Sequence, residues 1–189
     1  LVNKLNKNIF IYAPSVSDIY EGNTVSASFD YDGLEHQMEG KHRPGHFDGV
    51  GTIVKKLFEI VKPTNAYFGE KDFQQLQLIK TIAGDIEIIT APTIRESDGL
   101  ALSSRNVRLA PEGRTAAGVI YRALVQAKNE EELRAILATE SALTIDYADF
   151  IDEKTFAHAQ SDTQQVRAII AGWINGVRLI DNMAMGNRA

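Results

Sequence analysis

The sequence predicts an α/β fold in which a parallel-sheet unit is followed by a small α+β unit. In the first half of the chain, short apolar runs alternate with helical patterns, and this alternation is typical of βαβ units in a parallel sheet. Near the C-terminus, Asn175-Gly176 separates two apolar runs, which is the strongest short-range signal of a β-hairpin. We therefore expect one domain over residues 1–107 and a second domain, with a terminal hairpin, over residues 108–189.

Composition indicates the broad class of protein. The 189 residues are 44% hydrophobic and 24% charged with a net charge of −5, which is typical of a globular protein and disfavours general binding to nucleic acid. No apolar run approaches the roughly 18 residues of a membrane-spanning helix, so we expect no membrane partner. The chain has no Cys, which excludes disulfides and thiolate metal sites and fits a cytoplasmic protein.

The N-terminal elements begin abruptly. Residues 9–13 form a short, almost wholly apolar run that predicts a buried parallel strand. Because no earlier strand precedes it and the chain starts with Leu1, we expect the sequence to begin partway through a longer protein. Ser15 and Asp18 indicate a capped helical turn, and β-branched and aromatic residues over 24–32 predict a second strand.

The next stretch, residues 40–46, combines two His, a Lys and an Arg with a Pro and two Gly. Pro44 and Gly45 exclude a regular helix, so we expect a loop. Such a loop is either a solvated surface segment or a basic loop that faces a triphosphate, because arginine presents a planar fork to phosphate oxygens. His42 and His46 would suit a metal only on a helix, so we disfavour a metal site there.

A core helix over 50–61 then leads to the segment around which the chain is organised, FGEKDFQQ at 68–75. This segment joins a predicted strand at 65–68 to a predicted helix that starts at Asp72 and ends near Ala83. It should therefore turn at the carboxyl end of a parallel strand, where open α/β sheets bind their ligands.

Two interpretations of this turn remain open on local chemistry. In the first, Gly69 lets the backbone approach a ligand and Lys71 meets a phosphate at the helix N-terminus. In the second, Asp72 and Gln75 form a capping box and Lys71 is an ordinary solvated charge.

Two further segments complete the first domain. A strand over 85–90 starts directly after Gly84, and such a short link to the preceding helix indicates that loop residues are missing there. The stretch 92–106 has little regular period but holds two Arg, three Ser and a Gly. We expect either a mobile loop that closes on a polyphosphate or a plain surface loop in which Ser, Asn and Gly suit turns.

The C-terminal part has the pattern of a small α+β unit. Pro111 suits the first position of a helix, and Asn129 with Glu132 forms a capping box at the start of another. His158 has no chemical neighbours in the sequence and is expected at the surface. The predicted elements are helices over 111–127 and 129–137, a strand over 144–151, and a hairpin of strands over 165–173 and 177–182.

Taken together, these motifs mean that the sequence resembles the pantoate–β-alanine ligase (pantothenate synthetase) family. The motifs that carry the resemblance are long, ordered and spread over almost the whole chain. They are Ala13-Pro14-Ser15 leading to Ile19-Tyr20, Glu39-Gly40 leading to Arg43-Pro44-Gly45-His46-Phe47, Phe68 to Gln75, Arg95, Asp98 to Asn106, and Arg178 to Asn182.

The resemblance implies a Rossmann-like nucleotide domain, similar to that of class I aminoacyl-tRNA synthetases, and a two-step reaction. ATP and pantoate would first give an enzyme-bound pantoyl adenylate and pyrophosphate. β-Alanine would then attack the adenylate to give pantothenate and AMP. The family also implies Mg²⁺ as cofactor, a cytoplasmic location and a homodimer.

The resemblance also assigns roles to residues. Lys71, Ser103, Ser104 and Arg105 would be catalytic and hold phosphates as pyrophosphate leaves, and Gln75 would hydrogen-bond pantoate. Arg43 and His46 would support the site, and no metal ligand from the protein is expected. The implied ATP-binding residues are Gly69, Glu70, Lys71, Asp72, Ile94, Leu102, Ser103, Ser104 and Arg105.

One departure from the family keeps alternatives open. Family members carry an N-terminal Met-Gly segment and a His-x-Gly-His signature. This sequence lacks both, and it also lacks the first strands of the nucleotide domain. We therefore expect the chain to correspond to the C-terminal two-thirds of the enzyme. It is then an ATP-dependent ligase, a non-catalytic fragment of one, or a related nucleotidyltransferase with another substrate.

Overall fold

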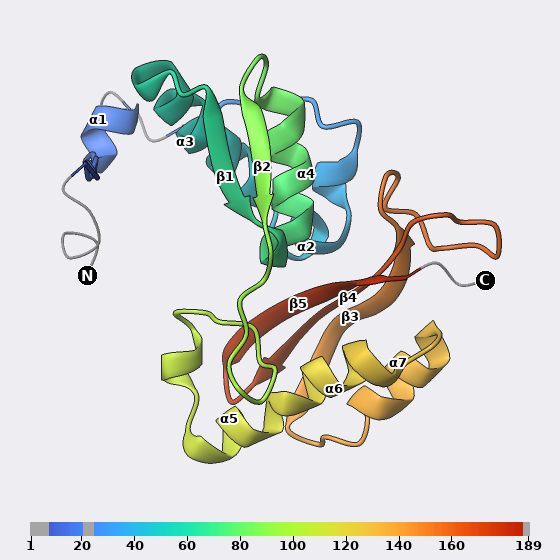
Figure 1. Ribbon diagram of the computed structural model, residues 1–189. Coiled ribbons are helices and arrows are strands. Elements are labelled where there is room, and N and C mark those ends of the chain that lie inside the picture. The colour runs from blue at the N-terminus through green and yellow to red at the C-terminus, as the bar shows by residue number, and fades with distance from the viewer. Residues whose placement is uncertain (1–7, 21–24, 187–189) are drawn as a thin grey trace.

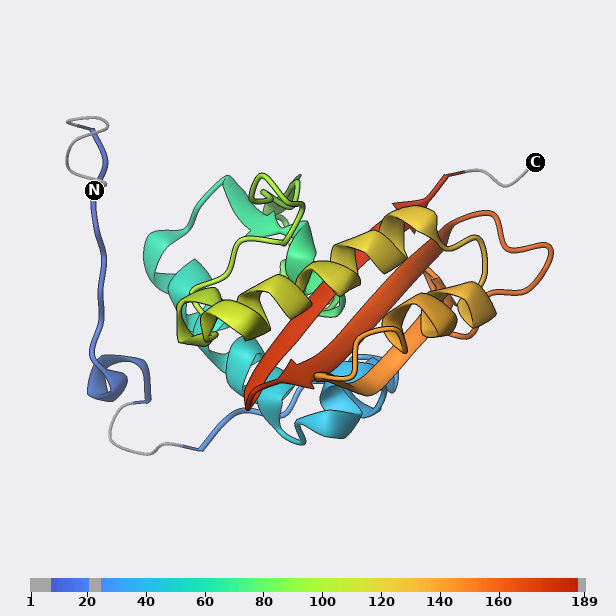
Figure 2. The same cartoon turned by 90° about the horizontal axis from the view of Figure 1, so that it is seen from below.

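The computed structural model describes residues 8–20 and 25–186 and contains two sheets (Figure 1). One is a parallel pair of strands and the other is a three-stranded antiparallel sheet of order β3-β4-β5. Figures 1 and 2 show the antiparallel sheet lying between the parallel unit on one face and helices on the other. The predicted α/β class, with a parallel unit followed by an α+β unit, is confirmed.

The parallel unit is the predicted strand–helix–strand motif. Strand β1 (Asn65–Gly69) pairs in parallel with β2 (Glu87–Ala91), and α4 (Phe73–Ile82) connects them. Helix α3 (His46–Val61) packs beside α4. It starts four residues earlier than predicted, directly after Gly45, whose backbone is left-handed with φ of 76°.

Two predicted strands do not form among the described residues. Residues 9–13 have no ladder partner in this part of the chain, and Phe10 is 93% exposed, so the prediction of a buried strand is wrong here. Residues 25–31 run along α3, because Ala27 N–H donates to Thr52 Oγ1 (2.8 Å). A side-chain acceptor on the helix thus replaces the sheet partner that a strand would need. Thr24, the first residue of the predicted strand, lies outside the described residues.

The short helix α1 (Val16–Tyr20) confirms the capping prediction. Ser15 N–H donates to Asp18 Oδ2 (2.8 Å), and Asp18 N–H donates back to Ser15 Oγ (3.3 Å). This is the reciprocal capping box, in which each side chain satisfies a backbone donor of the first turn.

The predicted loop before α3 is shorter than expected. The 3₁₀ helix η2 (Leu34–His36) precedes it, helix α2 (Met38–His42) includes residues 40–42, and α3 begins at His46. Only 43–45 therefore lies between the helices. Gln74 on α4 explains the added structure, since its Nε2 donates to the carbonyls of Leu34 (2.8 Å) and Gln37 (3.0 Å). A side chain 40 residues away therefore satisfies backbone carbonyls for which the local sequence indicated no hydrogen-bond partner.

The link between α4 and β2 is the short segment 83–86. A turn closes it through Ile86 N–H and Ala83 O (3.2 Å), and Gly84 takes the positive φ of 60° that the turn requires. The link therefore closes with the residues present, without the additional loop residues that its shortness had suggested. The helix ends one residue earlier, and the strand begins two residues later, than the periodicity indicated.

The C-terminal unit follows the prediction closely. Strands β4 (Val166–Ile174) and β5 (Val177–Met185) form the predicted hairpin, and both turn residues have positive φ, 49° at Asn175 and 75° at Gly176. Strand β3 (Leu143–Asp152) pairs antiparallel with β4.

Helices cover the outer face of this sheet. The single helix predicted over 111–127 is divided at Ala117 into α5 (Pro111–Ala116) and α6 (Gly118–Gln126). Helix α7 (Glu130–Leu137) has the predicted cap, since Asn129 accepts a hydrogen bond from Glu132 N–H (2.8 Å).

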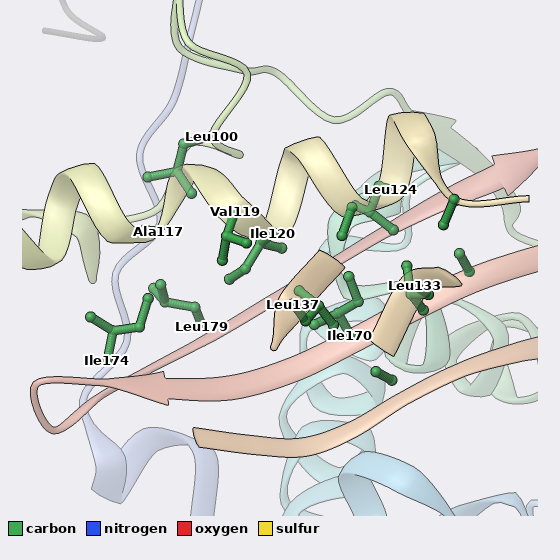
Figure 3. Close-up of a cluster of buried hydrophobic side chains, with 14 of the residues drawn as sticks. Leu100, Ala117, Val119, Ile120, Leu124, Leu133, Leu137, Ile170, Ile174 and Leu179 are labelled. Atoms are coloured by element: carbon green, nitrogen blue, oxygen red, sulfur yellow. The ribbon is translucent and has the colours of Figure 1, made fainter. Parts of the chain in front are cut away.

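The sheet is packed on both faces because its strands alternate. Figure 3 shows the larger core, in which Leu124, Leu133 and Leu137 of α6 and α7 meet the β4 side chain Ile170. Its neighbour Ile169 points to the other face and packs with a smaller core around Phe73, Leu76, Ile151 and Phe156. In the described part of the chain, no helix is long and apolar enough to cross a membrane.

Candidate active site

The turn after β1 presents a lysine without an ionic partner. β1 ends at Gly69, the 3₁₀ helix η3 spans Glu70–Asp72, and α4 starts at Phe73. Nothing lies within 4 Å of the position that a Gly69 Cβ would take, so the backbone is open to a ligand. Lys71 is half-buried, and no carboxylate among the described residues pairs with its ammonium group. Its charge is therefore available to an anion.

The capping-box interpretation of this turn does not hold. Asp72 occupies the N-cap of α4, but its side chain accepts no capping hydrogen bond. The first-turn N–H groups of α4 are therefore not neutralised by this carboxylate, which leaves the helix N-terminus favourable for an anion.

The segment that follows β2 is held in place instead of being mobile. Arg95 makes a bidentate ion pair with Asp181 on β5, at 2.7 and 3.0 Å, and its Nη1 also donates to Gly99 O (3.0 Å). Arg114 on α5 binds Asp98 (2.6 Å) and Glu96 (2.7 Å). These contacts fix the loop against the C-terminal unit, beside which Figure 1 shows it passing.

The Lys71 turn and this loop line one cavity, which we call the phosphate cavity. Ser103 Oγ accepts a hydrogen bond from Arg105 N–H (3.2 Å), and Arg105 Nη1 donates to Arg178 O (3.3 Å). Its polar lining residues are Lys71, Ser103, Arg105, Asn106, Arg178 and Asp181. The carboxyl ends of β1 and β2 thus deliver cations and a hydroxyl to one place, as the parallel topology predicts.

A second cavity adjoins the first and shares Lys71, Ile180 and Asp181 with it. Asp72, Gln75 and His46 give it polar edges. Its apolar walls are formed by Met38, Phe47, Phe73, Tyr147, Phe156, Ile169 and Ile180. Apolar walls with polar edges are the lining expected of a site for a small ligand that has an aliphatic body and polar ends.

Arg43 and His46 form a pair beside this cavity. The Arg43 Nη1 and His46 Nε2 atoms lie 2.9 Å apart, and because arginine only donates, His46 accepts at Nε2 and carries its proton on Nδ1. Burial, and then the Arg43 charge, lower the pKa of His46. His46 is consequently neutral at pH 7 and offers a hydrogen bond, not a charge.

Glu39 anchors the floor of the same cavity to the C-terminal sheet. It is buried, and it accepts hydrogen bonds from Arg178 Nη1 (2.8 Å) and Tyr147 OH (2.8 Å). Burial alone would raise the pKa of Glu39, but the hydrogen bonds from Arg178 and Tyr147 outweigh it and hold the pKa below its ordinary value.

Other expected site residues lie elsewhere. Ser104 is exposed, and Ile94 and Leu102 are 64% and 50% exposed on the loop, outside both cavities. The Glu70 carboxylate turns to the C-terminal sheet and binds Arg167 (2.8 Å).

Among the described residues, the group with metal-ligand chemistry is Glu130, Asp149 and His158, on the C-terminal unit. Arg134 already binds both carboxylates, at 3.1 and 2.6 Å, so this cluster is an ion-pair network. His158 is 68% exposed at its side chain, as expected of a surface residue, although it does have a neighbour in Glu130 (3.4 Å).

Several polar residues of the C-terminal sheet were not predicted as part of the site. Asp181, Asn182 and Arg178 on β5, with Arg167 on β4, are all less than 9% exposed. Two signals were available: residues 178–182 form one of the motifs that carry the family resemblance, and charged and amide side chains occur in strands otherwise rich in Ile, Val and Leu. Buried charges of this kind require partners, but the sequence did not indicate which ones.

Comparisons with known proteins point to one family. The family model described as pantoate–β-alanine ligase matches residues 2–184 of the chain. The chain is similar to the pantothenate synthetase of Flavobacterium psychrophilum, with 48% identity over 200 aligned residues that cover 97% of this chain and 71% of that protein. The corresponding enzyme of Christiangramia forsetii is 39% identical and is covered over 72% of its length.

Solved structures agree. A crystal structure of pantothenate synthetase from Thermus thermophilus matches with a TM-score of 0.83 and 38% identity, covering 90% of this chain and 67% of that one. A pantoate–β-alanine ligase from Francisella tularensis, solved with β-γ ATP and β-alanine, matches with a TM-score of 0.71 and 37% identity over 88% of this chain and 61% of that one.

Proposed function

The chain belongs to the pantoate–β-alanine ligase family, and from that premise we propose that it activates pantoate with ATP and transfers the pantoyl group to β-alanine. The products would be pantothenate, AMP and pyrophosphate, with pantoyl adenylate as the intermediate. The crystallised relative from Francisella tularensis, which holds β-γ ATP and β-alanine, supports these two ligands for the family.

The observation that carries the proposal is the phosphate cavity. Lys71 has no ionic partner among the described residues, and Arg105 and Ser103 line the same space. A lysine ammonium, a guanidinium and a hydroxyl are the groups that bind phosphate oxygens in proteins. Their convergence at the carboxyl ends of two parallel strands is the arrangement expected of a nucleotide site.

In the first step, a carboxylate oxygen of pantoate attacks the α-phosphorus of ATP. The bond from phosphorus to the bridging oxygen breaks, and pyrophosphate leaves with the electron pair. Lys71 and Arg105 would neutralise the negative charge that grows on pyrophosphate. Ser103 in the cavity and the exposed Ser104 beside it would donate hydrogen bonds. Residues of the turn, Gly69 to Asp72, and the loop residues Ile94 and Leu102 would line the nucleotide.

Pantoate would lie in the second cavity. Gln75 supplies an amide for its hydroxyl groups, and the apolar walls suit an acid with an aliphatic body. Arg43 and the neutral His46 support this cavity from α2 and α3. Because ATP and pantoate would then meet at Lys71, the reacting groups are brought together by position.

In the second step, the amine of β-alanine attacks the acyl carbon of the adenylate, and AMP leaves with its phosphate oxygen. The acyl adenylate is already activated, so the step needs no nucleophile from the protein. This agrees with a site in which no Ser–His pair is present among the described cavity residues and the chain has no Cys.

Mg²⁺ is expected to accompany ATP. Phosphate oxygens would supply most of the ligands of this metal. The site fits it because the Asp72 carboxylate lies beside Lys71 and has no ion pair among the described residues. Bound there, Mg²⁺ would neutralise phosphate charge.

We further propose a cytoplasmic homodimer and a domain boundary near residue 108, both of which follow from the family resemblance and the sequence pattern.

Pantoate-dependent exchange of labelled pyrophosphate into ATP tests the proposal. We expect exchange with pantoate and none with acids that lack its hydroxyls and methyl groups, since Gln75 and the apolar walls select for both. Exchange driven equally by another acid would identify a related nucleotidyltransferase. Absence of exchange with every acid would mean that the chain by itself does not catalyse adenylation.

A further inference from the structure

The Lys71 turn has little support from its own sequence. Gly69 has no side chain, Asp72 makes no capping hydrogen bond, and the Glu70 side chain leaves the turn to bind Arg167. A lysine that neutralises phosphate charge nevertheless needs a fixed backbone, because its ammonium sits at the end of a flexible stem.

The support comes from Asn182 on β5, 111 residues away in the sequence. Its side-chain Nδ2 donates to the carbonyl oxygens of Glu70 (3.1 Å) and Lys71 (2.8 Å). Asn182 is 5% exposed, so these bonds do not compete with water. One carboxamide therefore holds both peptide groups that carry Lys71.

Arg167 fixes which way this carboxamide faces. The Asn182 Oδ1 accepts from Arg167 Nη1 at 2.5 Å, and because a guanidinium only donates, Nδ2 must face the turn. Arg167 is itself held by Glu70 (2.8 Å) and Glu153 (2.9 Å), and its guanidinium lies over the Phe73 ring, 4.0 Å from the centroid. The donor geometry of Asn182 is thus set by a buried network.

The preceding residue, Asp181, holds the other half of the site. It binds Arg95, which in turn binds Gly99 O in the loop that carries Ser103 and Arg105. Two consecutive residues of β5 therefore hold the turn and the loop. One strand of the C-terminal sheet therefore sets the distance between Lys71 and Arg105 of the loop.

From this geometry we infer that Asn182 is a positioning residue for adenylation, which acts by holding the Glu70 and Lys71 carbonyls so that the Lys71 ammonium meets the leaving phosphates. This inference rests on the proposed function. It also assigns the C-terminal sheet a direct part in ordering the nucleotide site.

The test variant is Asn182→Asp, which keeps an oxygen facing Arg167 but removes the two hydrogen bonds to the turn. We expect ATP–pyrophosphate exchange to fall about a hundredfold, as displacement of a catalytic group by about 1 Å can produce. Asn182→Ala also removes the two hydrogen bonds but adds no charge, so it checks that the aspartate charge does not cause the fall in exchange. Glu153→Gln is the matched control, since it alters the same Arg167 network without touching the turn.

Two readouts separate positioning from a general structural role. In a Lys71→Ala background, Asn182→Asp should change exchange by less than about twofold, because its effect passes through Lys71. Hydrogen exchange of the amides over 71–75, measured without substrates, should accelerate in Asn182→Asp and Asn182→Ala and stay unchanged in Glu153→Gln.

A full additional loss in the Lys71→Ala background, or unchanged amide exchange in the turn, would overturn the inference. If the wild-type chain shows no pyrophosphate exchange, the proposed function fails, and the amide measurement still decides whether Asn182 holds the turn. If Asn182→Asp does not fold, the same measurements on Asn182→Ser decide the question.

Discussion

Lys71 lines both cavities, together with Ile180 and Asp181. Its lack of an ionic partner among the described residues distinguishes it from most charged residues nearby. Glu39, Glu70, Arg95 and Arg178 are all paired across the two units. The Lys71 ammonium, which has no ion pair beside these paired neighbours, is available to bind an anionic ligand. The charge of Lys71 should therefore contribute to catalysis and little to stability.

Lys71→Ala should lower the rate of ATP–pyrophosphate exchange by about a hundredfold to a thousandfold, the loss typical when one group that stabilises transition-state charge is removed. The free energy of unfolding should change by less than about 0.5 kcal/mol, because Lys71 is not in the core. Lys80→Ala, an exposed lysine at the end of α4, is the control and should change neither quantity. Near-normal exchange in Lys71→Ala would remove Lys71 from the mechanism.

His46 gives stability a pH dependence of defined sign. Its pKa in the folded protein is lowered by burial and by Arg43, so the unfolded chain binds more protons in the window below about pH 6.5. Stability from this residue is therefore present above pH 6.5 and is lost as pH falls toward the folded pKa.

Urea unfolding of wild type and His46→Gln at pH 5 and pH 7 measures this effect. The wild type should lose more stability than His46→Gln between the two pH values, since glutamine does not titrate. An equal loss in both proteins would mean that the Arg43–His46 contact does not depend on a neutral imidazole.

At the scale of elements, the loop after β2 is structured by ion pairs of two kinds. The Arg95–Asp181 pair is largely buried, with side-chain exposures of 18% and 2%. The Arg114–Asp98 pair is more exposed, at 27% and 48%. Removing one member of a buried pair strands the other charge, whereas an exposed pair is replaced by water.

Asp181→Asn should therefore cost about 3–5 kcal/mol of unfolding free energy, and Asp98→Asn at most about 1 kcal/mol. Urea titration gives both values, and limited proteolysis reports whether the loop has been released. We expect cleavage within 93–106 to accelerate in Asp181→Asn only. Comparable losses in the two variants would show that the buried pair does not anchor the loop.

The elements that the sequence predicted well are those with a local cause. Helix caps at Ser15 and Asn129 and the Asn175-Gly176 turn depend on neighbours in sequence, and all three are present. The strands predicted at 9–13 and 24–32 do not form among the described residues, because a strand requires a partner and an apolar run does not show whether one exists. Residues 34–42 became helical only because Gln74, from another element, satisfies their backbone.

At the scale of the whole molecule, a polar network joins the two units into one structure. Glu39 on α2 reaches Arg178 on β5, 139 residues away, and Tyr147 on β3. Three of the residues for which the sequence predicted phosphate binding, Lys71, Ser103 and Arg105, line one cavity, and their role in binding phosphate stays a prediction. It could not predict Asn182 or Asp181, because their roles arise from how the two sheets meet.

Glu39→Gln tests this network. It weakens the pair with Arg178, which is 8% exposed, so we expect a loss of about 3–5 kcal/mol and a broader or two-step urea transition as the parallel unit separates first. Glu59→Gln, an exposed carboxylate on α3, should shift stability by less than about 0.5 kcal/mol. A single sharp transition with wild-type stability would mean that the units are joined by apolar packing alone.

An isotope experiment distinguishes attack of pantoate on the α-phosphorus of ATP from attack on the terminal phosphate. Pantoate labelled with ¹⁸O in its carboxylate is incubated with ATP, Mg²⁺, β-alanine and the protein, and the nucleotide product is analysed by mass spectrometry. We predict AMP that carries one heavy oxygen from the carboxylate, released together with pyrophosphate. ADP with the label in inorganic phosphate would rule out adenylation, because the acid would then have attacked the terminal phosphate.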